Sequence, residues 1–447
     1  MMRAARWQEF ILKTRHGETS LYQSPREVLL ELRSGTGHVT RAHPERRDVL
    51  RILFLSPRQA WPLYSGARLR DYYFARALGR RAALTYVFFS DPGSAPPQPA
   101  DLPFCRKIVP VPSPRLYTPR KIVRGFLGRW PLPVVNYTSD EMKAALAGIL
   151  RTDRFDLVHL DSIHMAAYVP DLRRQTPAPV VYNWHNIESE LMRRYSTGVQ
   201  PPLRKLYAAW TACRLAALER QILLQAFGHV VCSERERAQL LRAVPKARIA
   251  VIENGVDTTF FAKAPVSPSR RHRIVFVGSM RYHGNVEAAV WFARSVWPWI
   301  RERFPAWRLT LVGYDPTPAV LALRGERNVE VTGTVEDVRP YYGEALAAIV
   351  PLRTGGGTRL KILEAMAAGV PVVSTTLGAE GLAVSPGRHL LIADRDEDWL
   401  RQLSALSLQG DLWNGLVTAG RDLVRSRYDW QILGEALYEN YSHWLNP

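Results

Sequence analysis

The sequence predicts an α/β protein with two doubly wound, parallel-sheet domains, and three observations support this fold class. From residue 51 onward, short β-rich runs alternate with longer helical patterns, as in parallel sheets whose strands are joined by helices. This alternation restarts after the polar, proline-containing stretch AKAPVSPSRRHR. The chain has 447 residues, whereas a single domain usually takes about 100 to 200 residues.

Each strand is predicted from a short run rich in β-branched and aromatic residues. For the first sheet the runs are RILFLS at 51, ALTYVFFS at 83, FDLVHLD at 155, PVVYNWH at 179, GHVVCS at 228 and RIAVIENG at 248. For the second sheet they are RIVFVGS at 273, RLTLVG at 308, NVEVTG at 328, AAIVPL at 347, VPVVST at 370 and HLLIAD at 389.

These runs divide the chain into five parts. Residues 1–50 lack the alternation, so we expect a basic extension that is either disordered or a small helical appendage. An N-terminal Rossmann-like domain is expected over 51–255, a linker over 256–272 and a second Rossmann-like domain over 273–425. Residues 426–447 are expected to form a helix that packs on a neighbouring domain. Its apolar residues share one helical face, and they are Ile432, Leu433, Leu437, Tyr441 and Trp444.

Positive charge is concentrated in the first predicted domain. The chain has 60 Lys and Arg against 41 Asp and Glu, a net charge of +19. Residues 51–255 contribute 30 − 15 = +15, residues 1–50 contribute 9 − 6 = +3, and the remainder contributes 21 − 20 = +1. A charge this uneven indicates a polyanionic partner, either nucleic acid or an anionic membrane surface.

Other composition features favour a cytoplasmic protein without a membrane span. No run of about 18 uninterrupted apolar residues occurs, and the N-terminal apolar block is too short and too charged for a signal peptide. Cys105, Cys213 and Cys232 fit neither a disulfide framework nor a metal-binding spacing.

A basic and apolar segment, Phe104–Trp130, interleaves Arg and Lys with Ile, Val, Leu, Phe and Trp. Residues 119–130 are expected to form a short amphipathic helix that lies on anionic lipid. A basic surface loop is the alternative. The cations assigned to the lipid surface are Arg120, Lys121, Arg124 and Arg129.

Candidate site residues follow the strands, because open parallel sheets bind ligands beyond the carboxyl ends of their strands. Gly66 precedes a helical pattern after the first run and would let the backbone approach a phosphate, although it can also serve the turn. His185 directly follows a buried strand and precedes Asn186 and Glu188. This histidine either belongs to the site or caps the next helix.

The most specific stretch runs from Pro351 to Leu382. Three glycines, 355–357, lead into a helix expected over Thr358–Ala368, and Gly369 ends it. The amides and positive dipole end of such a helix suit a pyrophosphate or sugar hydroxyls. Arg359 and Lys361 in the first turn oppose the dipole, which indicates an anionic ligand. Glu364 can accept hydrogen bonds from ribose hydroxyls.

The order of four motifs resembles the bacterial family 4 glycosyltransferases. These are NGVD at 254–257, FVGSM with a downstream LVG, VTGTVEDVRPYY, and GGGTRLKILEAMAAGVPVVST. The resemblance covers about residues 51–445. It implies the GT-B fold, in which two Rossmann-like domains have a cleft between them and a C-terminal helix closes back on the first. It also implies a retaining transferase that moves a hexose from a UDP- or GDP-sugar.

According to the resemblance, the acceptor is a lipid-linked or glycan molecule in cell-surface polysaccharide or glycolipid synthesis. The basic N-terminal domain would then face the membrane, and the enzyme would be peripheral on the inner face of the cytoplasmic membrane.

The resemblance also assigns site residues. Glu364 matches the second glutamate of the E-x7-E motif, which binds the donor ribose, and the first glutamate of that motif is replaced by Gly356. The amides of Gly356, Gly357 and Thr358 are therefore expected to contact the donor sugar. Further assignments are Arg281 and Lys361 to the diphosphate, with Arg359 beside them, His185 to the donor sugar, Gly66 to the first loop, and Gly333 and Val335 to the base.

The implied reaction is a front-face displacement in which the departing diphosphate helps to deprotonate the acceptor hydroxyl. It needs neither a protein nucleophile nor a metal, and catalysis is mainly electrostatic. Three alternatives remain open. They are a GT-B epimerase or phosphorylase, a non-enzymatic nucleic-acid-binding protein, and a degenerate transferase that binds donor without turnover because of Gly356.

Overall fold

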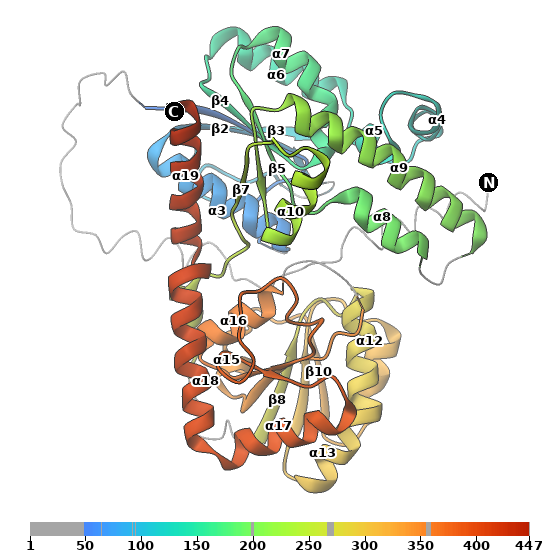
Figure 1. Cartoon of the computed structure of the whole chain (residues 1–447), viewed down its shortest axis with the longest axis vertical. Helices are drawn as coiled ribbons and strands as arrows, with labels where there is room; N and C mark the ends of the chain where they lie inside the picture. Colours follow the sequence, from blue (N-terminus) through green and yellow to red (C-terminus); the bar gives the residue numbers. More distant parts are fainter. Residues whose placement is uncertain are drawn as a thin grey trace, which may run out of the picture. The chain divides into compact units, whose positions relative to one another are not determined.

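The computed structural model describes residues 49–63, 65–91, 93, 95–197, 201–265, 272–354 and 359–446. The chain divides into two compact units. The N-terminal unit comprises Asp71–Glu253 and Gly434–Pro447 together with the described residues before Leu63. The C-terminal unit comprises Leu63–Arg70 and Asn254–Leu433. Each contains one parallel sheet flanked by helices (Figure 1).

A seven-stranded parallel sheet forms the centre of the N-terminal unit. Its strand order is β3-β2-β1-β4-β5-β6-β7, so the order reverses direction between β1 and β4. In doubly wound sheets this switch point opens a crevice at the carboxyl ends of the strands. The strands are β1 (Arg51–Ser56), β2 (Ala83–Ser90), β3 (Lys107–Pro112), β4 (Leu157–Asp161), β5 (Val180–Asn183), β6 (Gly228–Val231) and β7 (Ile249–Val251).

The helices before residue 254 cover this sheet. Buried side chains of β1 such as Leu53 and Leu55 share one core with residues of α6, α7 and α9. Local chemistry fixes several starts; for example, the Ser139 hydroxyl accepts a hydrogen bond from the Met142 amide at the beginning of α6. The helices are α3 (Gly66–Arg81), α4 (Pro119–Leu127), α5 (Leu132–Val135), α6 (Asp140–Thr152), η1 (Ile163–Tyr168), α7 (Val169–Gln175), α8 (Glu188–Thr197), α9 (Pro202–Gln225) and α10 (Glu234–Ala243).

The C-terminal unit has a six-stranded parallel sheet of the order β10-β9-β8-β11-β12-β13, whose switch point lies between β8 and β11. The strands are β8 (Arg273–Val277), β9 (Arg308–Val312), β10 (Val329–Gly333), β11 (Ala347–Val350), β12 (Val372–Ser374) and β13 (Leu391–Ile392). The helices are α11 (Thr258–Ala262), α12 (His283–Trp291), η3 (Phe292–Val296), α13 (Trp297–Arg303), α14 (Pro318–Leu321), η4 (Ala322–Gly325), α15 (Arg339–Gly343), α16 (Leu360–Ala368), α17 (Asp396–Leu408), α18 (Gly410–Leu423) and η5 (Val424–Tyr428).

The last helix, α19 (Trp430–Leu445), contributes residues to both units. Within the N-terminal unit, the hydroxyl of Tyr441 lies 2.6 Å from Nδ1 of the buried His159 in β4. The predicted apolar face is confirmed for Leu433, Leu437, Tyr441 and Trp444, which are all buried. The prediction is wrong for Ile432, which is 41% exposed, because helical periodicity identifies a face but not how far along the helix that face is covered.

All twelve predicted runs contain strands, and the predicted doubly wound α/β fold is confirmed. Sequence reasoning missed β3, which pairs with β2 at the edge of the first sheet. Pro110 and Pro112 lie inside this strand. Proline lacks the amide that a central strand must donate, so it is tolerated mainly at sheet edges and hides such strands from pattern reasoning.

The amphipathic helix expected over 119–130 is confirmed over 119–127 as α4. The expected extension lies outside the described residues up to position 48, as do residues 266–271 of the expected linker. In the part of the chain that the structure describes, we find no helix with the length and apolar character that crossing a membrane requires.

Candidate active site

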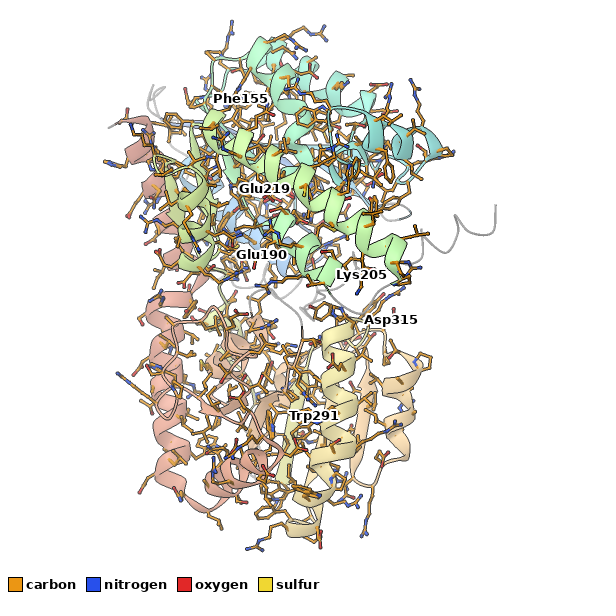
Figure 2. The ribbon with its side chains drawn as sticks, turned by 45° about the vertical axis from the view of Figure 1, so that its right-hand side comes forward. Phe155, Glu190, Lys205, Glu219, Trp291 and Asp315 are labelled. Carbon is orange, nitrogen blue, oxygen red and sulfur yellow. The ribbon has the colours of Figure 1, made fainter. Side chains whose placement is uncertain are left out.

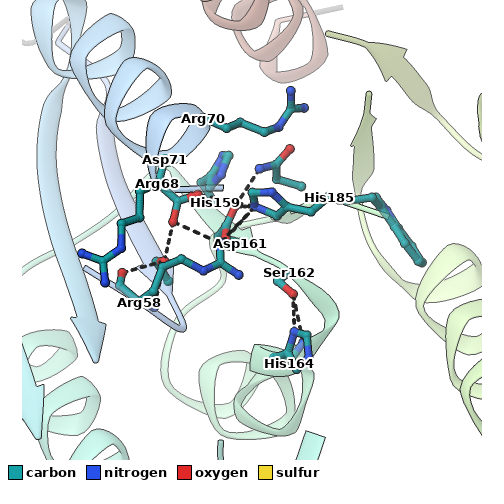
Figure 3. Close-up of polar contacts among 12 residues, drawn as sticks. Arg58, Arg68, Arg70, Asp71, His159, Asp161, Ser162, His164 and His185 are labelled. Carbon is teal, nitrogen blue, oxygen red and sulfur yellow. Dashed lines mark hydrogen bonds and ion pairs between the residues drawn. The ribbon is translucent and has the colours of Figure 1, made fainter. Parts of the chain in front are cut away.

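Four charged side chains meet at the switch point of the N-terminal unit (Figure 3). Arg58 follows β1 by two residues, and Asp161 is the last residue of β4, the neighbouring strand. His185 follows β5, and Asp71 lies in α3. Because the carboxyl ends of parallel strands meet at one edge of the sheet, residues distant in sequence form a single cluster there.

Nε2 of His185 is the centre of this cluster. It lies 2.8 Å and 2.9 Å from the two carboxylate oxygens of Asp161 and 3.4 Å from Oδ1 of Asp71. Nη1 of Arg58 lies 3.0 Å from Asp161, 3.3 Å from Asp71 and 3.3 Å from the same histidine nitrogen. The charged groups therefore compensate one another at short range.

Neutral side chains also donate to the two carboxylates, which are fully buried, although Oδ1 of Asp71 has no hydrogen-bond partner among the described residues. The amide of Asn183, at the end of β5, donates to Asp161 over 2.6 Å, and the hydroxyl of Ser56, at the end of β1, donates to Asp71 over 2.8 Å. Buried carboxylates require such donors because removing a charge from water is costly.

Burial and mutual charge shift the pKa values of these groups in different directions. Burial alone raises the pKa of Asp161, but the charge and hydrogen bond of His185, together with Arg58, hold it well below its usual range. Burial and the charge of Asp161 raise the pKa of Asp71. Burial lowers the pKa of His185, but Asp161 outweighs this and raises it. The cluster thus favours an ionised Asp161 beside a protonated His185.

Asp71, Asp161 and His185 offer three ligand atoms within 4.8 Å of one another, so we tested whether they fit a metal ion. The guanidinium of Arg58 contacts both carboxylates and the histidine nitrogen at 3.0–3.3 Å. It therefore stands where a cation would bind, and these residues fit a compensated ion cluster rather than a metal centre.

Among the residues that the structure describes, one ring nitrogen of His185, Nδ1, has no partner and is left for a substrate. Every contact given above uses Nε2, and the side chain is 12% exposed. With Nε2 held by Asp161, Nδ1 of a protonated ring is a hydrogen-bond donor.

A second polar cluster lies at the switch point of the C-terminal unit. Nζ of Lys361, in α16, donates to Oδ1 of Asn285, in α12, over 2.6 Å and lies 4.9 Å from the ring centre of Phe276. The side-chain amide of Asn285 donates to the backbone carbonyl of Ser279 over 2.8 Å. Asn285 thereby connects Lys361 to the loop after β8.

Gly278 permits this arrangement. A Cβ atom at this position would lie 2.8 Å from Nδ2 of Asn285 and 2.9 Å from Nζ of Lys361. The next residue, Ser279, is 3% exposed, and its hydroxyl has no hydrogen-bond partner among the described residues. A buried hydroxyl without a partner, one residue after the glycine that approaches the ammonium group, is suited to a polar ligand.

Glu364 and Arg359 are buried at α16. The hydroxyl of Tyr342 donates to Oε2 of Glu364 over 3.4 Å, and burial followed by the charge of Glu364 raises the pKa of that tyrosine well above its ordinary value. Arg359 precedes the helix and donates to the carbonyl of Leu377 over 3.3 Å. The predicted stop is confirmed, since Gly369 has the left-handed φ of +77° at the C-terminus.

The remaining predicted site residues are more scattered. The guanidinium of Arg281 pairs with the carboxylate of Asp315, and both side chains are more than a third exposed. Gly333 ends β10 with φ of +77°, and Val335 packs against the C-terminal core. Gly66 is the first residue of α3. Gly356, Gly357 and Thr358 lie outside the described residues.

Sequence reasoning missed Arg58, Asp71, Asp161 and Asn285. Asp161 had a usable signal, because a carboxylate that ends a buried strand lies where parallel sheets bind ligands. Asp71 and Asn285 lie inside helices, where nothing in the local pattern separates a site residue from a surface polar residue.

Comparisons with known proteins match both units. The family model described as "Glycosyltransferase Family 4" matches residues 64–260, and the one described as "Glycosyl transferases group 1" matches residues 271–407. The chain belongs to the family 4-like glycosyltransferases. Its two doubly wound sheets are those of the GT-B fold.

Curated relatives of the chain include two mannosyltransferases. A GDP-mannose-dependent monoacylated alpha-(1-6)-phosphatidylinositol monomannoside mannosyltransferase of Corynebacterium glutamicum is 32% identical over 145 residues, 30% of this chain and 38% of that protein. A GDP-mannose:cellobiosyl-diphosphopolyprenol alpha-mannosyltransferase of Xanthomonas oryzae pv. oryzae is 27% identical over 234 residues, 49% of this chain and 58% of that protein. The chain covers 33–58% of the length of the curated relatives that it matches.

Among solved structures, HepE of Anabaena in complex with UDP and glucose has a TM-score of 0.59 and 14% identity. The alignment covers 88% of this chain and 99% of HepE. At this identity the similarity establishes the shared fold alone.

Proposed function

We propose that the protein is a retaining, metal-independent glycosyltransferase that uses a nucleotide-sugar donor. The observation that carries this proposal is the polar cluster at the switch point of the C-terminal unit, where Lys361 lies on Asn285 beside the loop after β8. An ammonium group, a buried hydroxyl and a helix N-terminus at a switch point suit the diphosphate of a nucleotide.

Each residue of this site has a proposed role. Lys361 neutralises the diphosphate oxygens, and the buried carboxylate of Glu364 accepts hydrogen bonds from the donor ribose. The segment with Gly333 and Val335 adjoins the base, and Arg281 assists Lys361 once it is released from its exposed pair with Asp315. The amides of Gly356, Gly357 and Thr358 contact the donor sugar, as the resemblance implies, and Gly66 belongs to the first loop.

The proposed reaction replaces one bond to the anomeric carbon. The carbon–oxygen bond to the diphosphate breaks, the acceptor oxygen bonds to the same face of the sugar, and a phosphate oxygen takes the acceptor's proton. Lys361 stabilises the negative charge that develops on the diphosphate. His185 donates a hydrogen bond from Nδ1 to the transferred sugar and is held in its protonated form by Asp161.

The N-terminal cluster supports metal independence, because Arg58 already compensates the charges of Asp71 and Asp161 there. The nucleotide is proposed to be GDP or UDP, with GDP-mannose first, because both mannosyltransferase relatives are named for that donor. The acceptor is proposed to be lipid-linked or a glycan in cell-surface polysaccharide or glycolipid synthesis. The enzyme would act at the inner face of the cytoplasmic membrane.

The binding test uses thermal shift and calorimetry of the full chain with GDP, UDP, GDP-mannose and UDP-glucose. One nucleotide should raise the melting temperature of the wild type, and the shift should grow with the logarithm of its concentration once that exceeds the Kd. Glu364→Gln should lose most of this shift, whereas Glu302→Gln on the exposed side of α13 should keep it. Equal shifts in both variants would exclude the assigned ribose site.

The reaction test follows nucleotide release and sugar transfer to polyprenyl-diphosphate-linked saccharides. NMR of the product should show the anomeric configuration of the donor, and chelation of divalent metals should leave the rate unchanged. An inverted product or complete loss of activity with chelator would refute the corresponding part of the proposal.

A further inference from the structure

Helix α4 exposes large apolar side chains on its outer face. Val123 is 57% exposed, Phe126 41% and Leu127 86%. Val123 and Leu127 are four residues apart, so they lie on one side of the helix. Arg120 and Arg124, also four residues apart and exposed, lie beside them. The exposed surface of α4 is therefore apolar along one stripe and cationic along the next.

The exposed stripe belongs to a firmly held helix. The guanidinium of Arg214, in α9, donates to the backbone carbonyls of Gly125, Phe126 and Gly128 at the end of α4. The ring of Phe126 stacks on that of Trp210 with ring centres 4.9 Å apart. These contacts fix α4 on α9 and leave Val123 and Leu127 outward.

Helix α9 extends the same surface. Phe126 also approaches Tyr207, with ring centres 5.4 Å apart. Leu203 lies about one turn before Tyr207, and Leu206 directly precedes it. These leucines are 80% and 69% exposed. Lys205 lies between them in sequence, near the beginning of the helix (Figure 2). We call the exposed side chains of both helices the α4–α9 surface; its apolar members are Val123, Phe126, Leu127, Leu203 and Leu206.

The charge of the two segments that build this surface has one sign. Residues 102–139 contain seven Lys and Arg and no acidic residue, and residues 202–218 of α9 contain three and none. One of the predicted lipid-contacting cations is engaged elsewhere, because Nζ of Lys121 donates to the carbonyl of Asn136 over 2.8 Å. Arg120, Arg124, Arg129 and Lys205 are exposed.

We propose that the α4–α9 surface docks on an anionic lipid bilayer, with its apolar side chains below the headgroups and its cations among them. Isolated Leu and Val side chains at 57–86% exposure gain from entry into hydrocarbon, and cations without acidic neighbours gain from anionic headgroups. Nucleic acid would satisfy the cations but would leave the leucines in water. A second copy of the chain would place two cationic surfaces together, which like charges oppose.

The proposal is independent of the proposed transfer reaction, because binding to vesicles is measured without donor or acceptor. The full chain is sedimented with vesicles of phosphatidylcholine alone and of phosphatidylcholine with phosphatidylglycerol. Binding should require the anionic lipid and should weaken as salt rises. The variant V123S/L127S should bind at least about tenfold more weakly. R120Q/R124Q, which removes two of the four exposed cations, should weaken the dependence on anionic lipid.

The matched control is Leu408→Ser, which removes a leucine that is 73% exposed in the C-terminal unit. It should bind like the wild type. All of the substituted side chains are exposed, and unchanged melting temperatures establish that the variants fold. Three results would overturn the proposal. They are equal binding to both vesicle types, unchanged binding of V123S/L127S, and a dimer or an RNA complex that V123S/L127S abolishes while vesicle binding persists.

Discussion

Replacing Asp161 with asparagine is expected to destabilise the first sheet locally, because Asp161 balances two cations in a buried cluster. Removing one partner of a buried ion pair generally costs about 3–5 kcal/mol. Here Asp71 remains 3.3 Å from Arg58 and 3.4 Å from His185, and its repulsion by Asp161 is relieved. We therefore expect the lower end of the range, about 3 kcal/mol.

The loss of stability caused by Asp161→Asn should depend on pH in a definite direction. The pKa of Asp161 is held below its unfolded value of about 3.9, so its stabilisation is present above that value and is lost as pH falls through the folded pKa. The pKa of His185 is raised above about 6.5, so its stabilisation is complete below that value and is lost as pH rises through the folded pKa. The two together should make the Asp161→Asn effect larger near pH 5.5 than near pH 9.5.

Hydrogen exchange of peptides from β4 and β5 measures the loss of local stability in Asp161→Asn. A local measurement suits a chain with two units that need not unfold together. A loss of about 3 kcal/mol corresponds to exchange about 100-fold faster. The matched control is Asp153→Asn, which breaks the exposed pair with Lys107 and should cost less than about 1 kcal/mol. If Asp161→Asn exchanged no faster than Asp153→Asn, the cluster would not be a charge-balanced network.

Three further predictions concern other parts of the molecule. Asn285→Ala should lower kcat/KM about 10- to 100-fold by releasing Lys361. Asn285→Asp keeps an acceptor for the ammonium but loses the amide that donates to Ser279, so it should recover only part of the rate, and equal loss in both variants would count against a positioning role. Tyr441→Phe should lower the free energy of unfolding by about 1–3 kcal/mol, because it removes a hydroxyl that contacts the buried His159. The control is Tyr438→Phe, whose ring faces Arg81. Equal denaturation midpoints for the two variants would refute the role of the Tyr441 hydroxyl. Gly369→Ala should lower stability by about 1–2 kcal/mol, because φ is +77° and the Arg421 side chain occupies the place of a Cβ atom. The comparison in thermal melts is Gly325→Ala, where a Cβ atom would meet open space. Similar losses of stability in both variants would contradict this explanation.

The strands and the family could be read from the sequence because both depend on local order along the chain. The strands were predictable because buried strands of a parallel sheet are short apolar runs. The family was predictable because the residues of its motif are contiguous in the sequence, as GGGTRLKILEAM. His185 and Lys361 were found for the same reason, one after a strand and one beside a glycine loop. The edge strand β3 escaped because its two prolines removed the usual signal.

What the sequence by itself determined is the doubly wound α/β class, the two sets of strands, the uneven charge and the amphipathic character of residues 119–127. Only the tertiary structure decided which side chains meet. Arg58, Asp71, Asp161 and His185 are separated by as many as 127 residues, yet the switch point brings them within hydrogen-bonding distance. The tertiary structure also decided that Lys361 donates a hydrogen bond to Asn285 and that Ile432 faces solvent. The physical reason is that periodicity encodes which face of an element is apolar, whereas the partner of a polar side chain depends on how the elements pack.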